Sequence, residues 1–408
     1  MERADRPMKK SALMAVEAAL ECLLQLAEKE PIGDVERVAL DDAEGRVLAE
    51  PLIASLDLPP WPNSAMDGYA LRLVDWTGEP LAVSQTIFAG QAPEPLQSGT
   101  CARIFTGAPV PEGADCVELQ ENTELLEDGR VRFSQALRPR QNIREQGQET
   151  RCGETVLAAG TRLGPAQLGL AASLGIVELP VRRRPRVALL STGDELVRPG
   201  QPLGPGQIYN SNRTLLLSWL KRLGCSVLDA GILPDDPQLT RARLEELGEA
   251  DLILSTGGVS VGEADCLGQI LREEGELDLW KLAIKPGKPL TVGRYRGVPV
   301  IGLPGNPASS LVTFALLARP YLLRRLGVRA VMPLAFQVPA GFAWSKPGKR
   351  REYLRARLEN GRAVLYPNQS PGVLLSAAWA DGLVEVIEDT TLAEGDSVRF
   401  IPLSEVLG

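Results

Sequence analysis

The sequence predicts a multidomain protein in which a doubly wound α/β domain is combined with β-rich domains. Its 408 residues exceed one ordinary domain, since a domain holds about 100 to 200 residues. Residues 183–328 alternate apolar strand-like runs with helical stretches, which indicates a mostly parallel sheet with helices on both faces. Short β-like runs broken by Pro and Gly fill residues 49–150, and alternation with period two fills residues 329–408. We therefore expect a β-rich inserted domain and a C-terminal β-barrel-like domain beside the α/β domain.

The chain order indicates that the β-rich domain interrupts an N-terminal linking domain. Residues 11–29 have the spacing of an amphipathic helix, and Glu17 and Glu21 within it argue against a cleaved secretory signal. Residues 161–181 bring back a helix and a short strand after the β-rich stretch. The predicted domains are a linking domain of residues 1–48 and 151–182, the inserted domain of 49–150, the α/β domain of 183–328 and the C-terminal domain of 329–408.

The composition excludes several classes of function. The chain has no histidine, which rules out His-based triads, His general bases and ordinary His zinc sites. A net charge of -8 argues against nucleic acid as the main partner, because phosphate binding needs a basic surface. No run of about 18 uncharged apolar residues is present, so no membrane span is expected. The 6 cysteines show no CxxC pairing and are expected as reduced thiols, which favours the cytoplasm.

Two loops after predicted α/β strands carry the same Ser-Thr-Gly motif. They are "ALLSTGDEL" at 188–196 and "LILSTGGVS" at 252–260. Ligands of an open parallel sheet bind beyond the carboxyl ends of its strands, where hydroxyls and glycine amides suit a phosphate or another oxyanion. A helix cap and a tight turn would explain one such loop equally well, but two in one sheet favour a binding cleft. The candidate binding residues are Thr192, Gly193, Thr256, Gly257, Gly258 and Ser260.

Several carboxylates are expected at the same edge of the sheet. They belong to Glu195, Asp235, Asp236 and Asp265. Carboxylates converge mainly where a hard cation such as Mg²⁺ compensates their charge. Each could instead cap a helix, and we expect this of at least one of Asp235 and Asp236.

Two further stretches of the α/β domain could contact an anion. "WKLAIKPGKPLTVG" supplies Lys281, Lys285 and Lys288 around a Pro-Gly turn, and compact lysine charges suit phosphate or a tetrahedral oxyanion. Such turns also carry plain surface lysines, so that alternative stays open. "GLPGNPASS" at 302–310 predicts a helix start with Asn306 as its N-cap. Its candidate ligand contacts are Pro304, Asn306 and Ser309.

The inserted domain contributes a loop with one acid. "PPWPNSAMDGYA" at 59–70 holds too many breakers for a regular element, and it presents Asp67 beside Gly68, which allows a close approach to a ligand. "IFTGAPVPEGADCV" repeats the Thr-Gly theme at Thr106, and "NIREQGQET" offers Arg144 and Glu149. Spacing alone leaves open whether these residues face the α/β cleft of their own chain or that of a partner.

Taken in order, the motifs "NSAMDGYA", "FTGAPVPEGAD", "STGDEL", "STGGVSVGEAD", "KLAIKPGKP" and "GLPGNPAS" resemble the MoeA family, the molybdopterin molybdenumtransferases, which also includes the gephyrin E domain. The resemblance covers essentially the full chain. It implies a MogA-like third domain and an elongated homodimer, with a cleft between that domain and the inserted domain of the other subunit. It also implies a reaction in which adenylylated molybdopterin and molybdate give molybdenum cofactor and AMP, with Mg²⁺.

The resemblance also implies roles for individual residues. The catalytic set would be Asp67, Thr106, Glu149, Glu195, Lys281 and Lys285. Asp265 and Glu195 would hold the metal, and the lysines would bind molybdate. Thr192, Gly193, Thr256 and Gly257 would cradle the phosphate side of the pterin. The binding set is completed by Asp235, Asp236, Gly258, Ser260, Lys288, Pro304, Asn306 and Ser309. Arg350, Arg351 and Ser370 match the family loosely. The chain departs from many relatives at Pro62, where an acid is common, and at Glu149, which stands in an Asp position.

Two other functions remain alternatives. Adenylyl transfer onto molybdopterin would use the same α/β domain, but it would leave the inserted and C-terminal domains unexplained. A non-catalytic dimeric scaffold is the second, although no fused module or long linker supports it. Contact with a separate molybdopterin adenylyltransferase is a further expected partnership.

Overall fold

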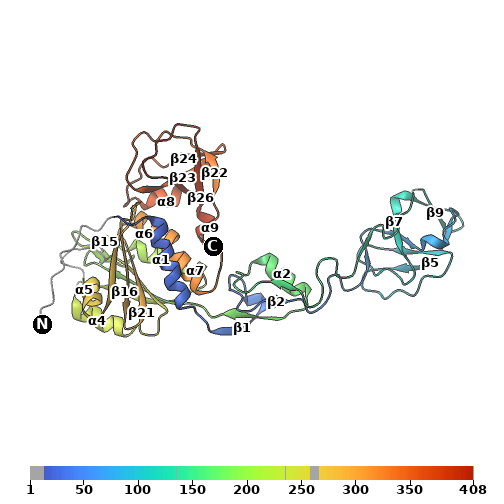
Figure 1. The fold of residues 1–408 in the computed structure, drawn as a ribbon, viewed down its shortest axis with the longest axis horizontal. Helices are drawn as coiled ribbons and strands as arrows, with labels where there is room; N and C mark the ends of the chain where they lie inside the picture. Colours follow the sequence, from blue (N-terminus) through green and yellow to red (C-terminus); the bar gives the residue numbers. More distant parts are fainter. Residues whose placement is uncertain (1–12, 135, 235, 258–265, 408) are drawn as a thin grey trace.

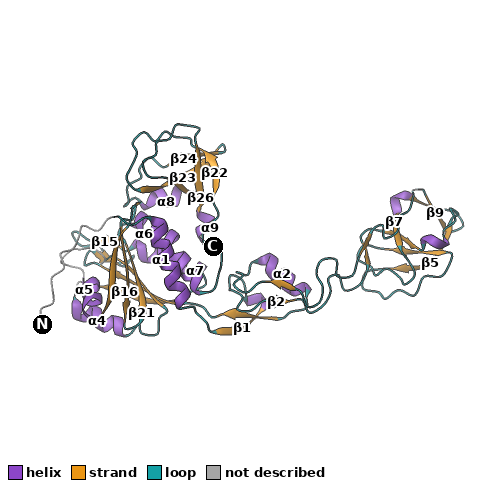
Figure 2. Cartoon of the chain, in the orientation of Figure 1, coloured by secondary structure: helices purple, strands orange, loops and turns teal. Residues whose placement is uncertain are grey.

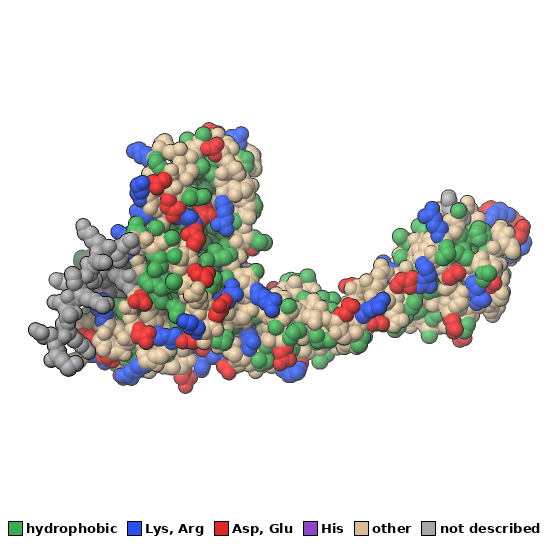
Figure 3. All heavy atoms as spheres, in the orientation of Figure 1, with side chains coloured by type: hydrophobic (Ala, Val, Ile, Leu, Met, Phe, Trp, Pro, Cys, Tyr) green, Lys and Arg blue, Asp and Glu red, His purple; other side chains and the backbone are tan. Residues whose placement is uncertain are grey.

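The protein is elongated, as its computed structural model shows for residues 13–134, 136–234, 236–257 and 266–407 (Figure 1). The α/β domain and the C-terminal domain lie together at one end, and the inserted domain lies at the other end beyond a narrow linking region. Helices gather around the α/β sheet, whereas the inserted domain is built mainly of strands (Figure 2). On the face in Figure 3, acidic and basic side chains are interspersed along the whole molecule. None of the described helices is long and apolar enough to cross a membrane.

The N-terminal helix packs on the α/β domain. Helix α1 (Val16–Lys29) buries Val16, Ala19, Leu23 and Ala27, whose spacing of three and four residues places them on one helical face. This face contacts α7 (Arg319–Arg325). The chain then enters the linking region, where β1 (Val35–Ala39) pairs antiparallel with β12 (Glu178–Arg182). The other elements here are η1 (Leu40–Asp42), β2 (Leu52–Ile53), β11 (Thr155–Leu157) and α2 (Pro165–Ser173).

The inserted domain is built on a six-stranded sheet of order β7-β4-β6-β5-β9-β8. A two-stranded neck, β3 (Asn63–Ser64) with β10 (Ile143–Arg144), connects it to the linking region. Alternating side chains supply two small cores, with Tyr69 in one and Ala70 in the other. The strands are β4 (Gly68–Leu71), β5 (Leu81–Ile87), β6 (Thr100–Ile104), β7 (Cys116–Leu119), β8 (Thr123–Leu125) and β9 (Arg130–Phe133), with the 3-10 turns η2 (Leu73–Asp75) and η3 (Gln120–Asn122).

The predicted doubly wound, mostly parallel α/β sheet is confirmed. Its order is β16-β13-β17-β21-β20-β18, and β20 runs opposite to the other strands of this sheet. Helices α1, α3, α6 and α7 pack on one face of the sheet, and α4 and α5 on the other. The strands are β13 (Arg186–Thr192), β16 (Ser226–Leu233), β17 (Leu252–Thr256), β18 (Gly275–Lys281), β20 (Pro289–Tyr295) and β21 (Val298–Leu303). The helices are α3 (Ser211–Arg222), α4 (Pro237–Glu245), α5 (Cys266–Glu274) and α6 (Pro307–Thr313), and a π-helical turn (Phe314–Ala318) joins α6 to α7. The short strands β14 (Leu196–Val197) and β15 (Ile208–Tyr209) pair beside the sheet.

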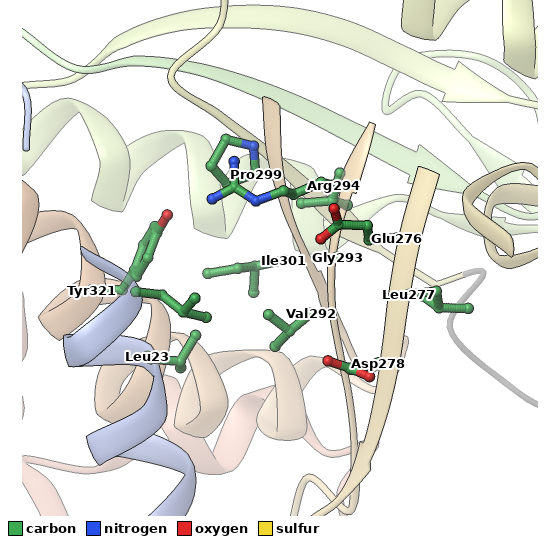
Figure 4. A pocket seen from close by; sticks show the side chains of 12 residues that line it. Leu23, Glu276, Leu277, Asp278, Val292, Gly293, Arg294, Pro299, Ile301 and Tyr321 are labelled. Carbon is green, nitrogen blue, oxygen red and sulfur yellow. The ribbon is translucent and has the colours of Figure 1, made fainter. Parts of the chain in front are cut away.

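A small cavity marks where α1 meets this sheet. It has a volume of about 90 Å³ and lies between Leu23 of α1, Tyr321 of α7 and Ile301 of β21 (Figure 4). Glu276 and Arg294 stand among its polar residues. None of the predicted site residues that the structure describes lines this cavity, so it belongs to the packing of the helix on the sheet.

The C-terminal domain is a small β-barrel-like unit, as predicted. Its sheet has the order β19-β23-β25-β26-β22, with β24 also paired to β23, and a bridge between Ala340 and Ala363 brings the β22 and β24 ends together. Strand β19 comes from the α/β stretch of the chain, so the two domains share a sheet edge. The elements are β19 (Ile284–Lys285), β22 (Phe336–Pro339), β23 (Arg351–Glu359), β24 (Arg362–Leu365), β25 (Gly382–Val386), β26 (Ser397–Pro402), α8 (Leu374–Trp379) and α9 (Leu403–Leu407).

Candidate active site

The main candidate site is a cavity at the carboxyl edge of the α/β sheet. Its volume is about 590 Å³. The chain passes from β13 to β16, which pairs with one side of β13, and then to β17, which pairs with the other side. The direction in which strands are added to the sheet therefore reverses between β13 and β17. Ligands of doubly wound sheets bind at such a reversal. The lining includes Thr192, Glu195, Asn210, Ser211, Asn212, Thr256, Gly257, Gly305, Asn306, Gly372 and Leu374.

Glycines let the loops of this cavity approach one another closely. Gly257 has φ +81°, and a Cβ atom on it would lie 2.7 Å from the carbonyl oxygen of Thr192. Gly193 has φ +135°, and its Cβ would lie 2.3 Å from a carboxylate oxygen of Glu195. These backbone angles favour glycine, because a side chain would meet steric resistance there. The two predicted Ser-Thr-Gly loops therefore lie in direct contact with each other.

Three buried polar atoms at the cavity have no hydrogen-bond partner among the described residues. They are Oγ1 of Thr192, Nδ2 of Asn210 and Oδ1 of Asn212, on side chains that are at most 7% exposed. The Asn212 amide nitrogen donates to the carbonyl oxygen of Gly305 at 2.6 Å, which fixes the side chain. A buried polar group without a partner costs about 1 to 3 kcal/mol. Such atoms therefore favour a polar ligand or water in the cavity.

The start of α3 is a part of the site that the sequence analysis missed. Asn210 caps this helix, because its Oδ1 accepts a hydrogen bond from the backbone amide of Arg213 at 3.1 Å. Ser211 and Asn212 follow in the first turn and line the cavity. The signal in the sequence is the Asn of "YNSNRT" directly before a helical pattern, which is the usual position of an N-cap.

Several predicted site residues do come together here. Thr192, Glu195, Thr256, Gly257 and Asn306 all line the cavity. Asn306 occupies the predicted N-cap position of α6 in backbone terms, but its side chain makes no capping hydrogen bond.

Pro304 and Ser309 act within the protein instead of lining the cavity. The carbonyl oxygen of Pro304 accepts from the Ser310 hydroxyl at 2.5 Å. Ser309 is buried, and its carbonyl oxygen accepts from the Thr313 hydroxyl at 2.8 Å.

The predicted carboxylate cluster is only partly described. Glu195 is exposed at the cavity, whereas Asp236 caps α4 by accepting from the amides of Gln238 at 2.8 Å and Leu239 at 2.9 Å. The expectation that one acid of this pair caps a helix is thereby confirmed. Among the described residues, no group of three or more His, Cys, Asp or Glu side chains could hold a metal ion. Asp235, Gly258, Ser260 and Asp265 lie outside the described residues.

The three predicted lysines lie near the same edge but do not line the cavity. Lys281 ends β18, which runs in the same direction as β21, so it lies at the carboxyl edge. Lys285 in β19 pairs with Glu352 of the C-terminal domain at 3.0 Å, and Glu352 is only 7% exposed. Lys288 precedes β20, and its carbonyl oxygen accepts from the Leu282 amide at 2.7 Å. All three side chains are exposed.

In the inserted domain, Asp67 and Thr106 form a close pair. Asp67 Oδ1 accepts from the backbone amide and from the hydroxyl of Thr106, each at 2.7 Å. The backbone bond, the hydroxyl bond and the nearby charge of Arg103 lower the pKa of Asp67. The close approach made by Gly68 is to strand β7, since a Cβ there would lie 1.8 Å from the carbonyl oxygen of Glu118.

The inserted-domain residues do not reach the α/β cavity within one chain. The two domains lie at opposite ends of the molecule (Figure 1). Glu149 is exposed below the neck, where its amide donates to the carbonyl oxygen of Leu58 at 2.8 Å. Arg144 belongs to the neck strand β10 and is exposed.

The loosely matched residues of the C-terminal domain have structural contacts. Arg350 donates to the carbonyl oxygen of Ile284 at 3.4 Å. Arg351 forms ion pairs with Glu17 of α1 and with Glu388. Ser370 lies in the segment that carries Gly372 to the cavity, and its carbonyl oxygen accepts from Arg355 at 3.2 Å.

Comparisons with known proteins agree along almost the whole chain. Profiles described as "MoeA N-terminal region (domain I and II)", "Probable molybdopterin binding domain" and "MoeA C-terminal region (domain IV)" match residues 14–175, 188–324 and 337–403. A molybdopterin molybdenumtransferase of Haemophilus influenzae is 39% identical over 91% of this chain and 95% of its own length. Molybdopterin molybdenumtransferase 2 of Mycobacterium tuberculosis is 39% identical over 90% of this chain and 95% of its own.

Solved structures give the same result. A molybdopterin biosynthesis MoeA protein from Pyrococcus horikoshii has a TM-score of 0.76 at 32% identity, over 96% of this chain and 99% of that one. A second structure of a MoeA protein from this organism has a TM-score of 0.82 at 28% identity, over 96% and 100% of the two chains.

Proposed function

The chain belongs to the MoeA family, and from this premise we propose that the cavity between β13 and β17 is the site of molybdenum insertion. The protein is a transferase of molybdenum cofactor biosynthesis that inserts molybdenum. Its substrates are a molybdopterin compound and molybdate. We infer more narrowly that the molybdopterin compound is adenylylated and that AMP leaves when molybdenum is inserted.

The observation that carries this proposal is the set of unpartnered polar atoms around the cavity. Thr192 Oγ1 and Asn210 Nδ2 can both donate hydrogen bonds, both residues line the cavity, and Asn210 is the N-cap of α3. The amides at the start of this twelve-residue helix add a positive potential. A phosphate group of the substrate would satisfy these donors. The proposed binding set is Thr192, Gly193, Asn210, Asn212, Thr256, Gly257 and Asn306.

The lysines at the carboxyl edge would bind molybdate. Molybdate is a tetrahedral dianion, and compact ammonium charges suit it. Lys281 stands at the end of β18, and Lys285 is held by Glu352 with almost half of its side chain exposed (48%). We propose that these two side chains hold the oxyanion above the cavity and that Lys288 adds charge. Their charge would also stabilise the departing AMP phosphate.

We propose that Asp67, Thr106 and Glu149 act on the cavity of a second subunit. The inserted domain lies far from its own α/β cavity, so a homodimer is the arrangement that would unite them. Because the pKa of Asp67 is lowered, this side chain is a carboxylate at neutral pH. It would therefore accept hydrogen bonds, orient a water molecule or face a cation.

Magnesium is part of the proposal as a companion of the substrate phosphates. When bound, Mg²⁺ would supply positive charge to the pyrophosphate oxygens. Glu195 is the described carboxylate at the cavity, and the described residues alone form no complete metal cluster. Glu195, together with substrate oxygens and Asp265, would hold the ion.

The direct test is an assay with purified protein. We expect AMP release from adenylylated molybdopterin that requires added molybdate. Incubation of molybdopterin with ATP should give no adenylylated product. If that second reaction occurred and the first did not, the protein would be an adenylyltransferase and the proposal would be wrong. Inactivity in both reactions would also contradict the proposal and would leave the scaffold as the remaining alternative.

A further inference from the structure

A buried arginine stands behind the C-terminal wall of the cavity. Arg355 in β23 is 1% exposed, and burial lowers its pKa to about 10. In the described part of the chain no carboxylate forms an ion pair with it. Burial removes the water that solvates a cation. Without a carboxylate to compensate its charge, the buried cation disfavours folding. Contacts other than an ion pair must therefore offset the burial of this charge.

The guanidinium donates to three separate acceptors instead. Its Nε donates to the Ser376 hydroxyl at 3.0 Å, and its Nη2 donates to the carbonyl oxygen of Ser370 at 3.2 Å. Its Nη1 reaches the carbonyl oxygen of Tyr353 at 3.4 Å. Two of these acceptors lie in one segment, residues 369–376, which we call the wall segment. A planar fork of donors suits acceptors that lie in different directions.

Other hydrogen bonds hold the wall segment on the same strand. Gln369 Oε1 accepts from the Arg355 amide at 2.9 Å, and its Nε2 donates to the Arg355 carbonyl oxygen at 2.9 Å. The Ser376 hydroxyl donates to the carbonyl oxygen of Val373 at 2.6 Å. Both ends of the wall segment, Gln369 and Ser376, are thus hydrogen-bonded to Arg355.

The wall segment reaches the α/β domain at the cavity. Gly372 and Leu374 line the cavity, and the carbonyl oxygen of Pro371 accepts from the amide of Ala308 at 3.0 Å. Ala308 is in the first turn of α6, where amides have no partner within the helix. This hydrogen bond is therefore a direct link between the wall segment and the sheet edge that carries the site.

We propose that Arg355 is a positioning residue that holds the wall segment against α6, so that the C-terminal domain closes the cavity around the anionic substrate. The inference rests on the proposed function for the identity of that substrate. It does not require Arg355 to touch the substrate. It explains why a forked cation is kept at a position where burial disfavours charge.

The first measurement is amide hydrogen exchange without substrate. In Arg355→Gln the fork is lost, and we expect faster exchange at Ala308 than in the wild type. The matched control is Arg362→Gln, which removes an arginine of the same domain that pairs with Glu394 at 3.1 Å, where neither residue belongs to the wall segment or lines the cavity. The control should leave the Ala308 exchange unchanged. Unchanged exchange in Arg355→Gln would overturn the proposal.

The second measurement is steady-state kinetics with adenylylated molybdopterin. We expect KM to rise about tenfold in Arg355→Gln, with a smaller change in kcat, because a displaced wall weakens binding. Arg355→Lys keeps the charge but not the fork, so it should not restore KM. Restoration by Lys would show that charge alone matters and would overturn the positioning role. Arg362→Gln should keep the wild-type KM.

A milder variant covers the case in which Arg355→Gln does not fold. Ser376→Ala removes the hydroxyl between Arg355 Nε and the Val373 carbonyl oxygen, and it should raise both Ala308 exchange and KM in the same direction. An unchanged KM in this variant would count against the proposal. A wild-type protein that released no AMP would contradict the proposed function, whereas the exchange measurement would still test Arg355.

Discussion

The Asp67 carboxylate and Thr106 are joined twice, because one oxygen of Asp67 accepts both the backbone amide and the hydroxyl of Thr106 at 2.7 Å. The pair fixes the tip of the proline-rich loop on the Thr-Gly turn that follows β6. Both residues matched family motifs that lie far apart in the sequence. Their contact unites those motifs into one unit that the inserted domain can present to another surface.

Replacement of Thr106 by valine should make Asp67 harder to ionise. The variant keeps the backbone bond but loses the hydroxyl bond, so the lowered pKa of Asp67 should move up toward its ordinary value. The acid limb of the pH profile of kcat/KM should shift to higher pH. Thr123→Val is the control, because its hydroxyl bonds the Gln120 carbonyl oxygen elsewhere in the inserted domain. An acid limb that stayed in place would exclude Asp67 ionisation as its cause.

The contact between Asp67 and Thr106 also determines in which direction the free energy of unfolding changes with pH. The pKa of Asp67 is lower in the folded protein than in the unfolded chain, so its contribution is present above the unfolded pKa. It is lost as pH falls through the folded pKa. In Thr106→Val the pH dependence of unfolding in this acid range should become weaker. Denaturant titrations of wild type and variant at several acid pH values measure this difference.

A site shared between subunits predicts that two inactive variants complement each other. In a mixture of Asp67→Ala and Lys281→Ala subunits, each heterodimer would contain one site with both defects and one intact site. Random pairing should restore about one quarter of wild-type activity after co-refolding or co-expression. If both residues served the same chain's cavity, every site would keep one defect and no activity would return.

The α/β domain could be predicted from the sequence because its physical signals are local. Strands buried on both faces read as continuous apolar runs, as in "VALL" of β13 and "LIL" of β17. Loops that follow such strands necessarily meet at one edge. For this reason Thr192 and Thr256 were both identified and both line the cavity.

The remaining parts of the site depend on contacts between domains, which have no local signal. Gly372 and Leu374 reach the cavity from the C-terminal domain, and the pairing of β19 with β23 turns Lys285 toward Glu352. Asn210 had a visible capping signal, but a cap does not reveal that its amide nitrogen lacks a hydrogen-bond partner within the described part of the chain. The distance of Asp67 from the cavity in its own chain likewise follows from tertiary structure alone.

Substitution of Gly257 by alanine should impair the cavity beyond its cost in backbone strain. When a glycine in the left-handed backbone region is replaced by alanine, the protein loses about 1 to 2 kcal/mol of stability. Gly297→Ala is the control for backbone strain alone. Gly297 has φ +86°, and an added Cβ would have no described atom within 4 Å. Gly257→Ala should lose more stability, because its Cβ would meet the Thr192 carbonyl oxygen at 2.7 Å. Unfolding by denaturant and KM separate the effects, and equal KM values would contradict the role of Gly257.

Replacement of Thr192 by valine should separate stability from function. The hydroxyl has no partner among the described residues, so its exchange for a methyl group removes an unsatisfied buried atom and should raise the free energy of unfolding by about 1 kcal/mol. The same change removes a proposed substrate contact, so KM for adenylylated molybdopterin should rise.

Thr240→Val is the matched control, because Thr240 Oγ1 is also buried without a described partner but lies in α4 and does not line the cavity. It should stabilise the protein and leave KM unchanged. A loss of stability in Thr192→Val would show that the hydroxyl serves the fold, and an unchanged KM would remove Thr192 from the binding set.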